Sequence, residues 1–110
     1  MAKINVDELL TKMLAAAAVP FKKQWPSAKD YAQSEFKKIA ESIVFIESQR
    51  ALGKMTPERA RLHLDIQKNA SRTVLLALEG LGIVTAEAMI NAALAVIKDT
   101  VNSALKFALL

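Results

Sequence analysis

The sequence predicts an all-α protein, and three observations support that prediction. The 110 residues are 53% hydrophobic with only three glycines and three prolines, a composition typical of helices. Apolar residues recur at spacings of three and four over long stretches. Capping residues followed by acidic side chains mark where these stretches begin. Because a chain of this length forms one domain with a modest core, we expect an antiparallel bundle of three long helices plus a kinked N-terminal helix.

The expected elements fill a single domain over residues 1–110. They are an N-terminal helix over 5–19, a connector over 20–26 bracketed by two prolines, and bundle helices over 27–52, 56–79 and 85–109. Each helix has a candidate N-cap, and these are Asn5, Ser27, Thr56 and Thr85. Pro20 disfavours continuation of the first helix, and Gly53 provides a short turn into Thr56. Helices 27–52 and 56–79 should therefore form an antiparallel hairpin.

The helix over 56–79 is predicted to lie in the middle of the bundle. Its apolar residues cover more than half of its circumference, and they are Ala60, Leu62, Leu64, Ile66, Ala70, Val74, Ala77 and Leu78. The narrow remainder carries Arg61, Asp65, Lys68 and Arg72. One neighbour cannot cover so wide an arc, so we expect this helix to pack on both the preceding and the following helix.

The two flanking helices have narrower apolar arcs. The predicted core of 27–52 consists of Ala28, Ala32, Phe36, Ile39, Ala40, Ile43 and Ile46. That of 85–109 consists of Met89, Ile90, Ala93, Leu94, Ile97, Val101, Ala104 and Ala108. On the last helix a polar stripe is expected to face solvent, and it contains Glu87, Asn91, Lys98 and Asn102.

A polar cluster is expected within the hairpin. His63 and Gln67 lie in the apolar arc of their helix, and the antiparallel register sets Glu47 opposite His63. Such groups need partners when buried, so the first interpretation is a hydrogen-bond network that fixes the hairpin register. The alternative is a carboxylate–histidine metal site. Ferritin-like bundles use Glu-x-x-His motifs, whereas this chain has a single histidine with Ala60 where the glutamate would stand.

Other catalytic and binding motifs are missing from the sequence. There is no cysteine, and Gly80-Leu81-Gly82 lacks the third glycine and the strand of a phosphate-binding loop. The lysine pairs Lys22-Lys23 and Lys37-Lys38 have no cluster of aromatic residues for base stacking, despite a net charge of +4. We therefore expect a non-enzymatic protein without a cofactor, a metal or a sequence-specific nucleic-acid partner. The alternatives are a metal- or ligand-binding bundle centred on Glu47 and His63 and an accessory protein that associates with nucleic acid through its scattered lysines.

The connector offers one possible membrane contact. No apolar run approaches the roughly 20 residues of a membrane span, and Asp7 and Glu8 do not suit a signal peptide, so a cytoplasmic location is expected. The connector combines aromatic and basic side chains that suit a membrane surface, and they are Phe21, Lys22, Lys23 and Trp25. A kink whose aromatic rings pack under neighbouring helices is the simpler interpretation.

Self-association is the function that the sequence favours most. The mean hydropathy of +0.22 is high for a small protein with much surface per residue. Several large apolar side chains fall outside the predicted core arcs or at the apolar C-terminus, and they are Phe45, Leu76, Leu105, Phe107, Leu109 and Leu110. We expect these residues to form contacts in a homo-oligomer, or in a larger assembly of the viral or phage type.

Overall fold

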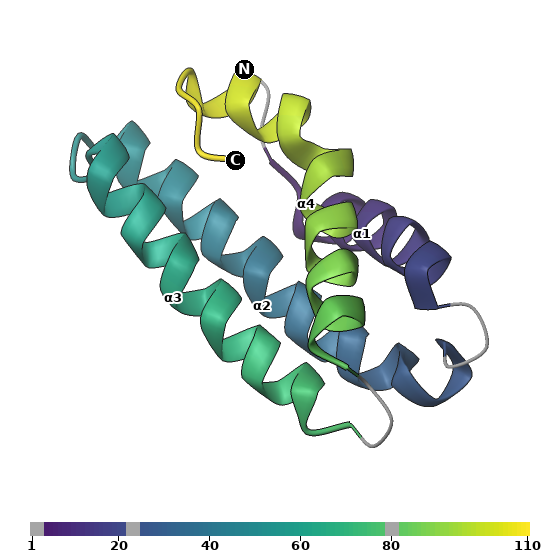
Figure 1. Cartoon of the computed structure of the whole chain (residues 1–110). Helices are drawn as coiled ribbons and strands as arrows, with labels where there is room; N and C mark the ends of the chain where they lie inside the picture. Colours follow the sequence, from purple (N-terminus) through teal and green to yellow (C-terminus); the bar gives the residue numbers. More distant parts are fainter. Residues whose placement is uncertain (1–3, 22–24, 79–81) are drawn as a thin grey trace.

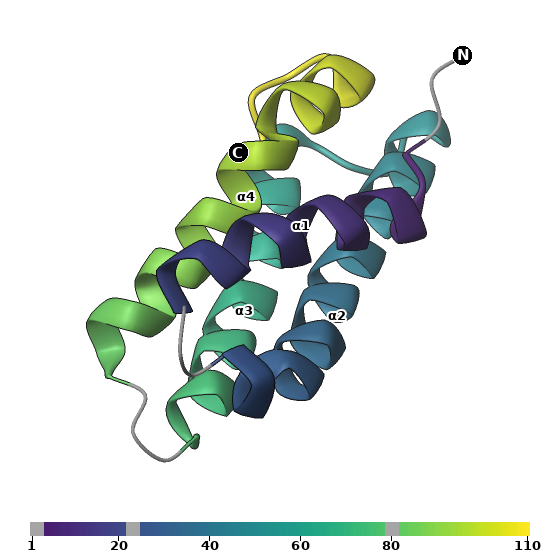
Figure 2. The same cartoon turned by 90° about the vertical axis from the view of Figure 1, so that its right-hand side faces the viewer.

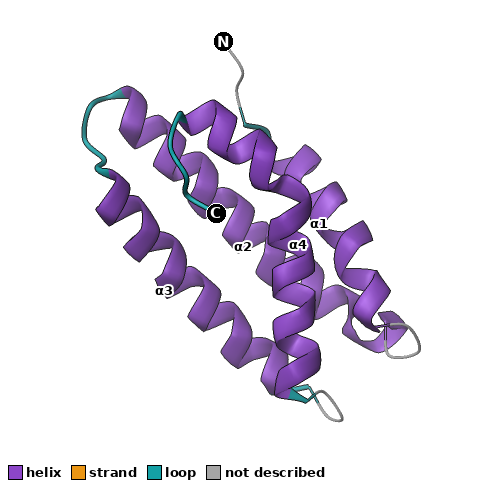
Figure 3. Ribbon diagram, turned by 45° about the horizontal axis from the view of Figure 1, so that its top comes forward, coloured by secondary structure: helices purple, strands orange, loops and turns teal. Residues whose placement is uncertain are grey.

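In the computed structural model, residues 4–21, 25–78 and 82–110 are described, and these residues form helices and no strands (Figures 1 and 3). The helices are α1 (Val6–Phe21), α2 (Trp25–Ala51), α3 (Pro57–Leu76) and α4 (Ile83–Leu105). The predicted all-α helical bundle is confirmed.

Successive helices alternate in direction and follow one another around the bundle (Figures 1 and 2). α1 packs between α2 and α4, and its contact with α4 is the most extensive in the molecule. α3 also contacts α2 and α4, but its contact with α4 is sparse. The bundle is therefore tightly packed along three of its sides and loose along the side between α3 and α4.

The molecule is elongated along α2. Its dimensions are 43 × 22 × 18 Å, and the 27 residues of α2 span about 40 Å of the long axis. Its accessible surface is 6503 Å², compared with about 6,000 Å² for a typical folded monomer of this mass. The excess is consistent with a bundle that leaves one side partly open.

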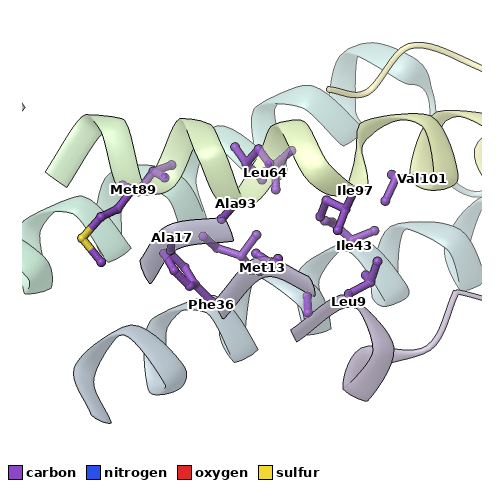
Figure 4. Packing of buried hydrophobic residues seen from close by; sticks show 14 of the residues in the cluster. Leu9, Met13, Ala17, Phe36, Ile43, Leu64, Met89, Ala93, Ile97 and Val101 are labelled. Atoms are coloured by element: carbon purple, nitrogen blue, oxygen red, sulfur yellow. The ribbon is translucent and has the colours of Figure 1, made fainter. Parts of the chain in front are cut away.

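The core lies between α1, α2 and α4. The predicted arc of α2 is confirmed, since every residue in it is buried, from Ala28 to Ile46. Figure 4 shows Met13 and Ala17 of α1 packed with Phe36 of α2 and Ala93 of α4. The small side chains of Ala17 and Ala93 allow α1 and α4 to approach closely. α4 contributes eight buried residues, which are Ala86, Met89, Ile90, Ala93, Leu94, Ile97, Val101 and Leu105.

α3 is less buried than its sequence predicts. It contacts both neighbours, but its buried residues are only Ala60, Leu64, Ser71 and Leu75. Leu62 and Ile66 are each 62% exposed. The prediction of a wide buried arc on a central helix is therefore wrong, because α1 occupies the position against α4 that α3 was expected to fill.

The hairpin between α2 and α3 follows the predicted turn. Gly53 has a φ of 73°. The N–H of Gly53 donates to the carbonyl of Arg50, and the N–H of Lys54 donates to the carbonyl of Gln49. This pattern closes α2 with a residue that tolerates the left-handed region. The Thr56 hydroxyl then accepts from the Arg59 N–H at 3.2 Å and Pro57 begins the helix, as predicted.

Several helix ends differ from the predicted boundaries. α1 continues through Pro20 to Phe21, because a proline in the last turn interrupts little of the remaining helix. α2 begins at Trp25, before the predicted cap Ser27. α3 ends at Leu76 instead of Glu79, which lies outside the described residues. α4 begins at Ile83 after Gly82, so Thr85 is not its cap.

The end of α4 is the largest boundary correction. The helix stops at Leu105 instead of residue 109, because Lys106 adopts a left-handed conformation with a φ of 62°. The Asn102 side chain then binds the returning chain. Its Oδ1 accepts from the N–H groups of Leu109 at 2.9 Å and Leu110 at 3.1 Å. Its Nδ2 donates to the Leu110 carbonyl at 3.3 Å. Residues 106–110, hereafter the C-terminal tail, therefore fold back along α4.

Candidate functional site

The predicted polar cluster of the hairpin does not assemble. His63 stacks on Phe45, with ring centroids 5.3 Å apart. Glu47 points elsewhere and accepts from the backbone N–H of Ile4, at 3.2 and 3.3 Å to its two carboxylate oxygens. Gln67 donates to Ser71 Oγ at 3.1 Å, which in turn donates to the Glu35 carbonyl at 3.5 Å. Glu47 and His63 thus have different partners, and the contact between α3 and α2 is made by Ser71, whereas the bond of Gln67 lies within α3.

Glu47 therefore anchors the residues that precede α1. Replacing Glu47 with alanine is expected to reduce the free energy of unfolding by about 1–2 kcal/mol, because the buried Ile4 loses its tether. Glu47→Gln keeps an acceptor and should cost less. Chemical denaturation of both variants measures the difference. Equal, negligible losses would show that the contact adds no stability.

The residues considered for metal contact lie in the described part of the chain, whereas those considered for membrane contact have side chains that the structure does not describe. Within the described part of the chain, no group of three or more His, Asp or Glu side chains is placed to hold a metal ion. Lys22 and Lys23 lie outside the described residues, and the side chains of Phe21 and Trp25 are likewise not described. None of the described helices is long and apolar enough to cross a membrane.

The C-terminal residues proposed as contacts pack within the chain. Leu105 is 1% exposed and Leu109 is 7% exposed, so their expected position outside the core is wrong. Phe107 and Leu110 are half-buried against the same core. Arg50 fastens this end of the bundle, since its Nε donates to the Leu105 carbonyl at 2.6 Å and its guanidinium lies 4.8 Å from the Phe107 ring centroid. The chain reverses at Lys106, where the sequence has no glycine to indicate a turn, and this reversal explains why Leu109 is buried.

The outward side of α3 carries the clearest apolar surface. The residues of this surface are all exposed and recur at spacings of three and four. They are Leu62, Ile66, Ala70 and Thr73 of α3 and Ala77, which directly follows the helix. Phe45 of α2, which is 46% exposed, extends this surface through its stack on His63. Leu76, 37% exposed, lies at its flank. We name these seven residues, from Phe45 to Ala77, the outer apolar face.

The predicted solvated stripe of α4 is only partly exposed. Asn91 and Lys98 face solvent as predicted. Glu87 and Asn102 are half-buried, because Glu87 forms an ion pair with Arg72 of α3 and Asn102 binds the C-terminal tail. Between these two positions lies a pocket of about 250 Å³ to which Lys68 of α3 and Asn91 and Lys98 of α4 contribute. The sequence predicts both polar stripes to face solvent, and the contact between Arg72 and Glu87 was not foreseen. The signal that was missed is that the stripes belong to consecutive antiparallel helices, which places them opposite each other.

Comparison with known proteins identifies no matching family model, and no curated protein or solved structure is significantly similar to the chain. Any functional assignment therefore rests on the structure itself. Two of its surface features are the outer apolar face and the pocket between α3 and α4.

Proposed function

We propose that this protein is a non-enzymatic helical interaction module that self-associates through the outer apolar face. The observation that supports it is the exposure of Leu62 and Ile66, each 62% exposed and one turn apart on α3. Single exposed apolar residues are ordinary, but a continuous row along a helix marks an interaction surface. The row from Leu62 to Ala77 is about 22 Å long, which is enough for two helices to pack side by side.

A second copy of the chain fits this face. Two α3 helices related by a two-fold axis perpendicular to them run antiparallel, so each residue meets a residue from the other end of the row. Leu62 then lies opposite Ala77 of the second copy, and Ile66 lies opposite Thr73. Large side chains thus meet small ones, which allows the two surfaces to interdigitate.

The polar groups on and beside the row are compatible with this pairing. The Thr73 hydroxyl already donates to the Asn69 carbonyl at 3.0 Å, so burying it leaves no unpaired donor. Asp65 and Arg72 lie on the side of α3 that faces α4, where Asp65 lines the pocket and Arg72 pairs with Glu87, so this pairing of the outer apolar faces does not require either charge.

The oligomeric state tests the proposal. Light scattering at micromolar concentration should give a mass above the 12.0 kDa of one chain. Ile66→Lys should shift the protein to the monomer. Val96→Lys, which alters a 46% exposed residue on α4, is the matched control and should leave the mass unchanged. A wild-type mass of one chain that does not depend on concentration overturns the proposal.

Disulfide trapping tests the geometry of the pair. The chain has no cysteine, so introduced thiols report only on chosen positions. Mixing Ile66→Cys with Thr73→Cys should give a crosslinked heterodimer under mild oxidation, whereas each variant alone should crosslink poorly. Efficient crosslinking of the single variants alone would instead indicate a parallel pair.

Assembly beyond a dimer needs a second surface, because an isologous contact closes on itself. Ile83 and Val84 at the start of α4, 60% and 79% exposed, are the candidates for such a contact. We therefore extend the proposal to a subunit of a larger, viral-type assembly. If Val84→Lys reduces a higher-order mass to that of a dimer, the second contact is supported. If the wild-type mass stops at two chains, the extension is discarded.

A further inference from the structure

The positive charge of the protein is concentrated at one end of the bundle. There the turn between α2 and α3 meets the end of α4, and Figure 1 shows both in the upper part of the molecule. Residues 48–61 and 100–108 contain five basic side chains and one carboxylate, that of Glu58. The rest of the chain contains ten basic and ten acidic residues, so these two segments account for the whole net charge of +4. The five basic residues, hereafter the basic end, are Arg50, Lys54, Arg59, Arg61 and Lys106.

The C-terminal tail brings the basic residues of three helices together. Arg50 Nε donates to the Leu105 carbonyl at 2.6 Å, and Arg61 Nε donates to the Ala108 carbonyl at 3.2 Å. Lys106 lies between these two carbonyls in the chain and is exposed. The tail is thus fastened to α2 on one side and to α3 on the other, and the cations of this end keep fixed relative positions.

The two arginines that hold the tail are also oriented by it. A guanidinium has five N–H donors in a planar fork, and in Arg50 and Arg61 the Nε donor is directed at the tail. The guanidinium of Arg50 lies over the Phe107 ring, 4.8 Å from its centroid. The remaining donors of a guanidinium match the oxygens of a phosphate, and an oriented side chain loses less entropy when it binds one.

The neighbouring carboxylates leave this charge in excess. Within the described part of the chain, the two ion pairs are Glu35 with Lys38 and Arg72 with Glu87, so neither includes a residue of the basic end. The next carboxylate on α2 is Glu47, which accepts from the backbone of Ile4. The next one on α4 is Asp99, seven residues before Lys106 and therefore about 10 Å away along the helix.

The two chain ends do not neutralise the basic end either. The acidic first turn of α1, with Asp7 and Glu8, belongs to a helix that makes no contact with α3 in the described residues. Leu110 returns along α4 to the pocket that Lys68 and Lys98 also line. Its main-chain carboxylate therefore lies with those two lysines and not with the basic end.

The size of this end suits a stretch of nucleic-acid duplex. The two short dimensions of the molecule are 22 and 18 Å. A duplex strand carries one phosphate per about 3.4 Å, so a length of 22 Å holds about six phosphates on each strand. Arg59 and Arg61 are two residues apart in the first turn of α3, so they point to different sides of that helix. The cations are therefore spread over the width of the end, where each can meet a different phosphate.

Other polyanionic surfaces fit this end less well. Proteins bind single strands by stacking bases on aromatic side chains, whereas the one aromatic residue of these two segments, Phe107, is half-buried and already contacts Arg50. A membrane surface requires apolar side chains that insert between lipids. Leu52, which is 65% exposed, is the single large apolar side chain that these segments expose.

We propose that the basic end binds the phosphate backbone of double-stranded nucleic acid without reading its sequence. Arg50 and Arg61 donate hydrogen bonds to phosphate oxygens, and Lys54, Arg59 and Lys106 add charge that releases counterions from the duplex. An antiparallel pair of α3 helices would place the two basic ends at opposite ends of the dimer, so each stays accessible. The contact does not require that pairing, and the two proposals can therefore fail separately.

Fluorescence anisotropy with a labelled DNA duplex of about 20 base pairs tests the proposal. The logarithm of the binding constant should fall with the logarithm of the salt concentration with a slope of about −3 to −4.5, as three to five phosphate contacts give. A duplex of unrelated sequence should bind equally well, and a single strand of the same length should bind more weakly. No binding at about 50 mM salt, or a slope near zero, overturns the proposal.

The same titrations separate the duplex from other partners. Vesicles of phosphatidylcholine and phosphatidylserine should not retain the protein on sedimentation at a salt concentration at which the duplex is bound. Retention on vesicles without duplex binding would assign the basic end to a membrane surface and overturn the proposal. Tighter binding of the single strand than of the duplex would overturn it as well.

Variants of matched net charge locate the site. The triple variant Lys54→Gln/Arg59→Gln/Lys106→Gln leaves the two arginines that fasten the tail in place. It should weaken duplex binding by about tenfold or more at low salt and make the slope shallower by about 2 to 3.

The control Lys12→Gln/Lys29→Gln/Lys37→Gln removes the same charge at exposed positions of α1 and α2. It should keep the slope and retain the affinity within about threefold, because distant charges are screened by salt. Equal losses in the two triple variants would show that net charge alone drives binding and would overturn the assignment, as would unchanged binding in the first.

Discussion

Replacing Phe36 by alanine is expected to reduce the free energy of unfolding by about 3–5 kcal/mol, the range found for deleting a buried aromatic side chain. Phe36 is 0% exposed and lies where α1, α2 and α4 meet (Figure 4). The cavity that remains cannot collapse easily, because the neighbouring alanines Ala17 and Ala93 already bring α1 and α4 close together. A domain of this size has a total stability of only about 5–15 kcal/mol, so the variant should be close to unfolding at moderate temperature.

The same helix provides the matched control for Phe36. Phe45 is 46% exposed, and its main contact is the stack on His63, so Phe45→Ala should cost about 0.5–1.5 kcal/mol. Urea titration followed by far-ultraviolet circular dichroism measures both variants. All samples need the same protein concentration, because self-association would make the apparent stability depend on it. Similar losses for the two phenylalanines would mean that Phe36 is not at the centre of the core.

The helices and the core of α2 could be predicted because local signals determine them. Thr56 caps the start of α3 and Pro57 is its first residue. Gly53 follows the end of α2 and adopts the positive φ of the turn. The apolar residues from Ala28 to Ile46 form a single stripe on α2. None of these features depends on which helix is packed against which. Local chemistry was therefore sufficient for the fold class and for the hairpin.

The helix neighbours could not be predicted, and the candidate sites depend on them. Leu62 of α3 and Leu94 of α4 are both apolar, but only Leu94 is buried, because α1 takes the place beside α4. The position of α1 also decides what Glu47 binds, since its carboxylate meets the backbone of Ile4 rather than His63. Periodicity defines the faces of a helix, whereas the order of helices around the bundle defines which face is left exposed.

The C-terminal tail shows how a single side chain can overrule a helical pattern. Ala104 and Ala108 continue the apolar spacing of α4, so the sequence favours a helix to residue 109. In the structure Asn102 competes for the backbone by binding the N–H groups of Leu109 and Leu110. The left-handed Lys106 permits the reversal at a cost that the burial of Leu109 offsets.

Replacing Asn102 by alanine is therefore expected to release the C-terminal tail and reduce the free energy of unfolding by about 1–3 kcal/mol, since three hydrogen bonds are lost and Leu109 leaves the core. Amide hydrogen exchange should show loss of protection at Leu109 and Leu110.

Two further variants separate the contribution of the Asn102 side chain from general effects on helix stability. Asn102→Asp keeps the acceptor for both N–H groups but sets an oxygen against the Leu110 carbonyl in place of the donor, so it should retain part of the stability that Asn102→Ala loses. Asn69→Ala, at an exposed position on α3, controls for the higher helix propensity of alanine and should change stability by less than about 0.5 kcal/mol. If Asn102→Ala is as stable as Asn69→Ala and keeps the exchange protection of Leu109, the tail is held by its apolar contacts alone.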